Sequence, residues 1–141
     1  MKKRYSVCFY LVTLFCLFLA SASAHATDRS MTLSYISFSA ETYNAIEVNN
    51  IGAFGSHRRI ISSRMKAKII RMLEAEQNSF VKPAQFDKQT VRLKVAIPRL
   101  HSVWIVDQKG CVLHKNRYYQ LSAKQFNTLR RLLAKLYVGE P

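Results

Sequence analysis

The side chains best suited to covalent chemistry lie close together in the C-terminal third of the sequence. Cys111 is the last of three cysteines, His101 and His114 flank it, and Asp107 lies between the two histidines. A thiol activated by a histidine, with a carboxylate to orient the ring, is the minimal arrangement of a cysteine nucleophile. These residues define one hypothesis, a small thiol-dependent enzyme that uses Cys111 with His101 or His114.

Strand geometry argues against this chemistry. Side chains alternate along a strand, so Cys111 and His114, three residues apart, should face opposite sides of a sheet. Unpaired cysteines are also among the most buried residue types. We therefore predict a buried structural thiol, assign no catalytic residue and favour a non-enzymatic protein. In an oxidising compartment, a second reading of Cys111 is a disulfide that joins two copies of the chain.

A metal centre or an organic cofactor has even less support. After residue 26, the only soft ligands that we consider are His57, His101, His114 and Cys111, and their spacing forms neither a helical i, i+4 pair nor C-x-x-C. A structural zinc site needs about four converging ligands. The sequence also lacks a Gly-rich phosphate loop, G-x-S-x-G and H-E-x-x-H. We predict no metal and no cofactor.

The N-terminal segment predicts where the protein works. Residues 2–4 are cationic, residues 5–20 are mostly apolar, and residues 21–26 are small and offer two A-x-A frames. This order is typical of a secretory signal peptide, with cleavage near Ala24 or Ala26. The prediction is a periplasmic or secreted protein. An uncleaved membrane anchor is the alternative, because about 20 apolar residues can span a bilayer.

Positive charge dominates the remaining chain. Residues 27–141 fit one small domain, and they hold 19 Lys and Arg against 8 Asp and Glu, a net charge of +11. The imbalance is local: residues 27–57 contain one cation and three anions, whereas residues 88–135 contain eleven cations and one anion. A field of this asymmetry favours an anionic partner or surface.

We therefore predict an exported, non-enzymatic binding protein that recognises an acidic protein or an envelope polyanion. The basic helix expected at 58–77 adds a peripheral membrane contact as an option. An exported nucleic-acid-binding accessory ranks lower, although Trp104, Tyr118 and Tyr119 lie among the cations and could stack on bases. The residues expected to bind the anionic partner are Arg92, Lys94, Lys109, Lys115, Arg117, Arg130 and Arg131.

The periodicity of apolar residues predicts the elements that carry these side chains. Residues 31–39 have a strand composition, and residues 43–48 show weaker alternation. A helix is expected over 58–77, with Ser56 as its cap. Its apolar stripe comprises Ile61, Met65, Ile69, Met72 and Leu73.

The C-terminal half predicts a three-stranded meander over 90–121, followed by a helix over 123–137. Period-two alternation in 91–97 places Arg92 and Lys94 on a basic outer face, and Gly110 supplies a turn. Ser122 and Gln125 have the spacing of a helix-capping pair. The expected fold is α+β: a small antiparallel sheet, built from N-terminal strands and the meander, with two amphipathic helices packed on it.

Overall fold

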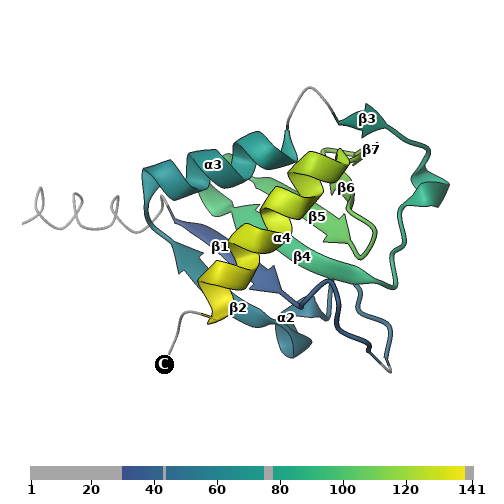
Figure 1. The fold of residues 1–141 in the computed structure, drawn as a ribbon, viewed down its shortest axis with the longest axis horizontal. Helices are drawn as coiled ribbons and strands as arrows, with labels where there is room; N and C mark the ends of the chain where they lie inside the picture. Colours follow the sequence, from purple (N-terminus) through teal and green to yellow (C-terminus); the bar gives the residue numbers. More distant parts are fainter. Residues whose placement is uncertain (1–29, 43, 75–77, 139–141) are drawn as a thin grey trace, which may run out of the picture.

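The computed structural model describes residues 30–42, 44–74 and 78–138 and confirms the predicted α+β fold (Figure 1). The predicted signal peptide lies outside these residues. Seven antiparallel strands form one sheet in the order β2-β1-β4-β5-β6-β7-β3. The strands are β1 Met31–Tyr35, β2 Ser56–Ile60, β3 Ser79–Phe80, β4 Val91–Ile97, β5 Ser102–Asp107, β6 Cys111–His114 and β7 Arg117–Gln120. The α-helices are α2 Ile51–Phe54, α3 Ser63–Leu73 and α4 Ala123–Val138.

The meander contains one strand more than predicted, because β4, β5, β6 and β7 all pair with their sequence neighbours. Gly110 makes the turn between β5 and β6 possible, as the sequence predicted. It has a φ of 81°, and an added Cβ would lie 2.8 Å from the Phe126 ring. The turn and α4 are therefore packed directly against each other.

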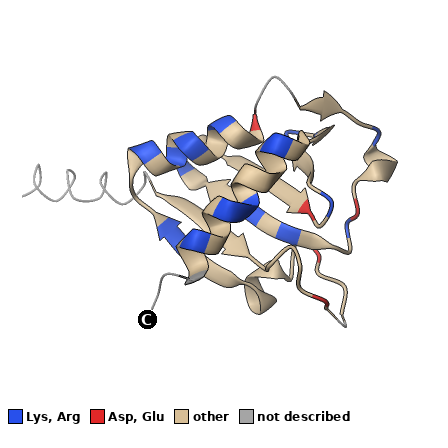
Figure 2. Cartoon of the chain, in the orientation of Figure 1, with Lys and Arg blue, Asp and Glu red and all other residues tan. Residues whose placement is uncertain are grey.

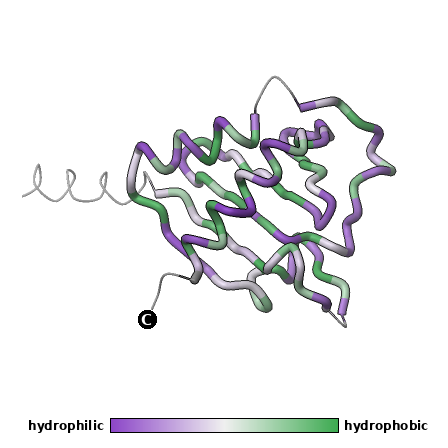
Figure 3. The backbone as a smooth tube through the Cα atoms, in the orientation of Figure 1, coloured by the Kyte–Doolittle hydropathy of each residue, from purple (hydrophilic) through white to green (hydrophobic). Residues whose placement is uncertain are grey.

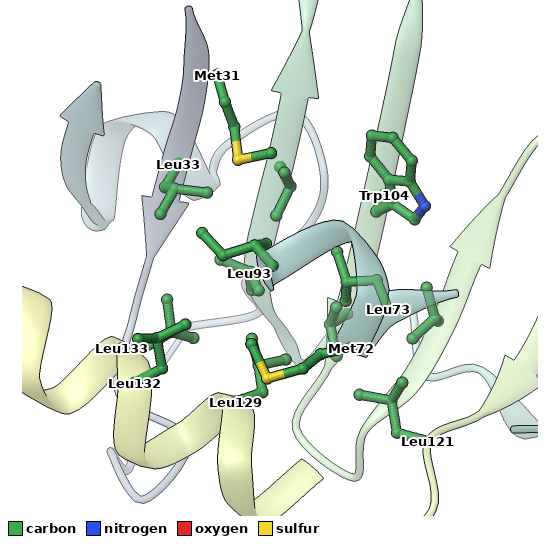
Figure 4. Close-up of a cluster of buried hydrophobic side chains, with 14 of the residues drawn as sticks. Met31, Leu33, Met72, Leu73, Leu93, Trp104, Leu121, Leu129, Leu132 and Leu133 are labelled. Atoms are coloured by element: carbon green, nitrogen blue, oxygen red, sulfur yellow. The ribbon is translucent and has the colours of Figure 1, made fainter. Parts of the chain in front are cut away.

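Helices α3 and α4 cover one face of the sheet, and the main core lies between them and the strands (Figure 4). Leu73 from α3, Leu93 from β4 and Leu133 from α4 are fully buried there. The tube in Figure 3 alternates between hydrophobic and hydrophilic along both helices, as expected for helices with one buried stripe. None of the helices in the described residues is both long and apolar enough to cross a membrane.

The predicted start of the first long helix was wrong. Residues 56–60 form β2, which pairs with β1, and α3 begins only at Ser63. Ser62, not Ser56, is the cap, since its side chain accepts a hydrogen bond from the Met65 backbone N–H at 3.3 Å. Ile61 consequently lies outside the helical stripe and is 76% exposed. Long-range pairing with β1 determined the structure of 56–60, which local periodicity could not register.

The opposite face of the sheet is covered by loops, not by long helices. Residues 44–54, including α2, and residues 81–90 pack a second, smaller cluster there, the loop-side cluster, around Ile51, Phe86 and Cys111. The strand expected over 43–48 is absent from the described part of that stretch, where Ile46 makes a single bridge to Thr90. The strand expected over 31–39 ends at Tyr35. The molecule thus has a helix-covered face and a loop-covered face.

Candidate functional site

Lys and Arg recur along both α3 and α4 (Figure 2). The two helices contact each other, and neither contains an Asp or Glu. We call the solvent-facing side of these two helices the helix layer. Its cations are Arg64, Lys66, Lys68, Arg71, Lys124, Arg130, Arg131 and Lys135.

Local packing holds part of the helix layer in place. Arg130 lies over the Phe126 ring, with 5.7 Å from its guanidinium carbon to the ring centroid. Arg58 on β2 donates a hydrogen bond to the Leu136 carbonyl, near the C-terminal end of α4. Cations at that end also interact favourably with the helix dipole. The result is a broad positive surface on two packed helices.

Arg92 does not belong to any exposed surface, and its predicted place on a basic outer face was wrong. It is 2% exposed and donates hydrogen bonds to the carbonyls of Val91 and Ala40 and to Gln108 Oε1, at 3.2–3.3 Å. Burial lowers the pKa of its guanidinium, and the nearby Asp87 carboxylate partly offsets this effect. Arg92 ties the loop over 36–42 to the β5–β6 turn.

A bulge explains why alternation failed at this position. The register between β4 and β5 shifts between Val91 and Leu93. One extra residue in a strand reverses the faces that follow it. Val91 accordingly packs in the loop-side cluster, whereas Leu93 packs under the helices.

The other predicted binding residues fall in four separate places. Lys94 is half-buried and lies opposite Ile105, a member of the loop-side cluster. Lys109 is exposed in the β5–β6 turn, at the start of β6. Lys115 and Arg117 are exposed at the β6–β7 turn, at the opposite end of β6. Arg130 and Arg131 are exposed on α4. The structure therefore pairs Lys115 with Arg117 and Arg130 with Arg131, but it does not gather all seven residues into one patch.

Cys111 is buried in the loop-side cluster, at 1% exposure. Burial, reinforced by the nearby Asp107 carboxylate, raises the pKa of its thiol to about 11. His114 faces the helix-covered side, where it stacks on Trp104, so the two side chains lie on opposite faces as alternation predicted. This geometry does not support a Cys111–His114 catalytic pair.

Asp107 is fully buried beside this cluster and accepts three backbone N–H groups. Its carboxylate oxygens lie 2.9 Å from the N–H groups of Lys109 and Cys111 and 3.0 Å from that of Asp87. Desolvation nevertheless raises the pKa of Asp107, and the Asp87 carboxylate adds to that rise while the backbone N–H groups oppose it. Its contacts organise the β5–β6 turn.

The aromatic residues proposed to stack on bases are largely inside the protein. Trp104 is 3% exposed and Tyr119 is 9% exposed, while half-buried Tyr118 packs against Phe86 with ring centroids 5.8 Å apart. Exposed π-faces are what single-stranded nucleic acid requires. Among the described residues, no three His, Cys, Asp or Glu side chains come together as a metal site.

One concave site lies at the end of α3, beside the edge of the sheet. It is a cavity of about 590 Å³, which we call the end pocket. Its lining comes from the end of α3, from β3 and from the β6–β7 hairpin: Glu74, Asn78, Phe80, His114, Lys115, Arg117 and Tyr119.

A hydrogen bond determines which ring nitrogen of His114, the histidine in this pocket, carries a proton in the neutral form. His114 Nδ1 lies 2.8 Å from the Val103 carbonyl oxygen, which can only accept, so Nδ1 carries a proton. Its Nε2 lies 3.6 Å from Glu74 Oε1. In the neutral ring Nε2 is an acceptor, so an ion pair with Glu74 forms only when His114 is protonated.

Sequence reasoning offered the basic helix at 58–77 only as an optional membrane contact, and it did not identify the end pocket. For the helix layer a signal existed: the residues that form α3 and α4 contain only cations among their charged residues. The end pocket combines side chains that lie up to 45 positions apart, from Glu74 to Tyr119, and no local pattern marks it.

Comparison with known proteins adds no assignment. No family model, no curated protein and no solved structure matches this chain.

Proposed function

We propose that this chain is an exported, non-enzymatic binding protein that holds an anionic polymer or surface of the cell envelope against its helix layer. The observation that carries the proposal is the charge of two adjacent helices, which contain eight cations and no anion. An excess of charge of one sign on neighbouring elements creates a field that attracts and steers polyanions.

The extent of this surface favours an extended partner. Helix α4 has 16 residues and is about 24 Å long, at 1.5 Å per residue. Its exposed cations run from Lys124, at its start, to Lys135, near its end. A repeating array of phosphate or carboxylate groups could neutralise many of these charges at once, whereas a single small anion could not. An acidic protein is the competing partner from the sequence, and the test below separates the two.

The experiment compares vesicles of phosphatidylglycerol, vesicles of phosphatidylcholine and soluble polyglutamate as partners. We expect binding to phosphatidylglycerol, little binding to phosphatidylcholine, and steep weakening as salt rises, because surface charges are screened. Stronger binding to polyglutamate than to the anionic vesicles would favour an acidic protein instead. Binding that does not weaken with salt would contradict an electrostatic surface altogether.

Two charge-matched variants localise the interaction. The first is Lys124→Glu, Arg131→Glu and Lys135→Glu together, all exposed on α4. The control is Lys82→Glu, Lys88→Glu and Arg99→Glu, all exposed and outside α3 and α4. Both change the net charge equally, and both should leave the melting temperature nearly unchanged because exposed charges contribute little to stability. We expect at least tenfold weaker vesicle binding for the α4 variant only. Equal losses would mean that net charge alone is responsible.

A further inference from the structure

The end pocket contains a buried polar group without a partner. Tyr119 lines the pocket, is 9% exposed, and its hydroxyl makes no hydrogen bond within the described structure. A buried hydroxyl left without a hydrogen-bond partner is energetically unfavourable. Burial raises the pKa of Tyr119, with a further rise from the Glu74 carboxylate, so the hydroxyl stays protonated and can donate.

Cross-strand pairing places four of the pocket side chains on one face of the sheet. Phe80 lies directly opposite Tyr119 in the β3–β7 ladder, and His114 lies opposite Arg117 in the β6–β7 ladder. Directly opposed residues project to the same side. Phe80 is 76% exposed, which is unusual for a phenylalanine and leaves its ring available to a ligand.

The charges of the pocket select the sign of the ligand. Lys115 and Arg117 supply two exposed cations, and Glu74 supplies one carboxylate. Glu74 lies beside His114, which offsets its charge when protonated. Among the described lining residues the two cations outnumber the carboxylate, and arginine in particular binds carboxylate and phosphate groups through two parallel hydrogen bonds.

We propose that the end pocket binds a small organic anion with an aromatic body. The acid group contacts Lys115 and Arg117, the ring packs against Phe80, and a polar atom of the ligand accepts the free Tyr119 hydroxyl. The cavity volume of about 590 Å³ lies within the usual range for small-molecule sites. This site is separate from the helix layer and does not depend on the function proposed for it.

Trp104 supplies a direct readout of binding. It is the only tryptophan of the chain, and it stacks on His114 with the ring centroids 4.2 Å apart. The probes are phenyl phosphate, benzoate, inorganic phosphate and benzyl alcohol, followed by Trp104 fluorescence and by amide NMR shifts. We expect saturable binding of at least one of the two aromatic acids at millimolar concentration. Which of them binds more tightly distinguishes a phosphate from a carboxylate ligand.

Three variants test whether the aromatic acid binds in the end pocket. Arg117→Gln with Lys115→Gln should weaken the aromatic acid about tenfold or more, whereas Lys109→Gln, in the other hairpin turn, should have no effect. Tyr119→Phe should weaken it several-fold while the melting temperature stays the same or rises, because the lost hydroxyl has no partner among the described residues.

Several outcomes would overturn the proposal. Inorganic phosphate that binds as tightly as phenyl phosphate would remove the role of the ring, and benzyl alcohol that binds as tightly would remove the role of the charge. If neither phenyl phosphate nor benzoate binds saturably, the proposed site is rejected. Loss of vesicle binding in the α4 variant with unchanged aromatic-acid binding would instead confirm that the two sites are independent.

Discussion

The two faces of the sheet are built on different principles. Under α3 and α4 the core is a continuous cluster of 18 buried apolar residues, and the charged side chains of the helices stay outside. Under the loops the cluster has six buried members, and two ionisable groups, Arg92 and Asp107, are buried beside it. The helix-covered face is held by apolar area, and the loop-covered face depends in addition on buried polar contacts.

This difference arises because helices and loops provide hydrogen-bond partners for their backbone N–H and C=O groups in different ways. A helix closes its N–H and C=O groups internally and can present an apolar stripe to the sheet. Loops cannot, so buried loop backbone needs side-chain partners. Asp107 and Arg92 supply them: the carboxylate accepts three backbone N–H groups, and the guanidinium binds two backbone carbonyls.

The largest expected effect comes from making cavities on the two faces. Leu133→Ala under the helices should lower the free energy of unfolding by about 3–5 kcal/mol, because a large rigid cluster cannot collapse into the space. Ile51→Ala under the loops should cost about 2 kcal/mol, since the short α2 segment can relax. Both wild-type residues are fully buried, which makes the pair comparable. Urea unfolding measures the two values, and a larger loss for Ile51→Ala would contradict the ranking.

Sequence reasoning succeeded where the signal was local. Helix 123–137 was predicted almost to its ends, and Ser122 accepts the Gln125 backbone N–H at 3.3 Å as the capping pattern implied. The meander was predicted over the correct residues, because alternation and turn residues recur within a few positions, although it has four strands and not three. The α+β class follows from these elements alone.

The same reasoning failed where distant segments decide the structure. Arg92 donates a hydrogen bond to the Ala40 carbonyl, 52 positions away in the sequence. It also lies at a bulge between Val91 and Leu93, which an alternation pattern does not reveal. Residues 58–60 were predicted as the start of a helix, but residues 56–60 pair with β1. The end pocket likewise exists only after β3 has paired with β7. Candidate sites formed by several distant segments therefore could not be predicted from local sequence patterns.

The next expected effect tests the buried carboxylate of the loop-covered face. Asp107→Asn places an amide NH₂ against one of the backbone N–H groups that the carboxylate accepts, so stability at neutral pH should fall by about 1–3 kcal/mol. Urea unfolding measures this loss. An equal loss in Asn127→Ala, an exposed position on α4, would show that the effect is not specific to the buried site.

The stability difference between the wild-type chain and Asp107→Asn should depend on pH with a definite sign. The pKa of Asp107 is raised in the folded state, so its contribution to stability is full below the ordinary aspartate pKa and is lost as pH rises through the raised value. The wild-type chain should therefore gain stability relative to Asp107→Asn on acidification. A difference that shrinks on acidification would mean that the three hydrogen bonds outweigh desolvation.

The smallest effect on stability, and the sharpest comparison of the two faces, comes from the buried thiol. Cys111→Ala should cost only about 1 kcal/mol, because it removes one buried sulfur. At pH 8 the thiol is both buried and mostly protonated, with its pKa raised to about 11, so iodoacetamide should modify it slowly in the native protein. Site-resolved mass spectrometry gives the rate.

A matched reporter on the other face turns that rate into a comparison. Leu129→Cys, made in the Cys111→Ala background, places a thiol under α4, where Leu129 is fully buried. Loops open locally at a lower free energy than packed helices, so Cys111 should react faster than the introduced thiol when both are corrected for their thiol pKa. Equal rates would mean that both faces open only in global unfolding. Fast reaction of Cys111 in the native protein would instead restore the thiol-enzyme hypothesis.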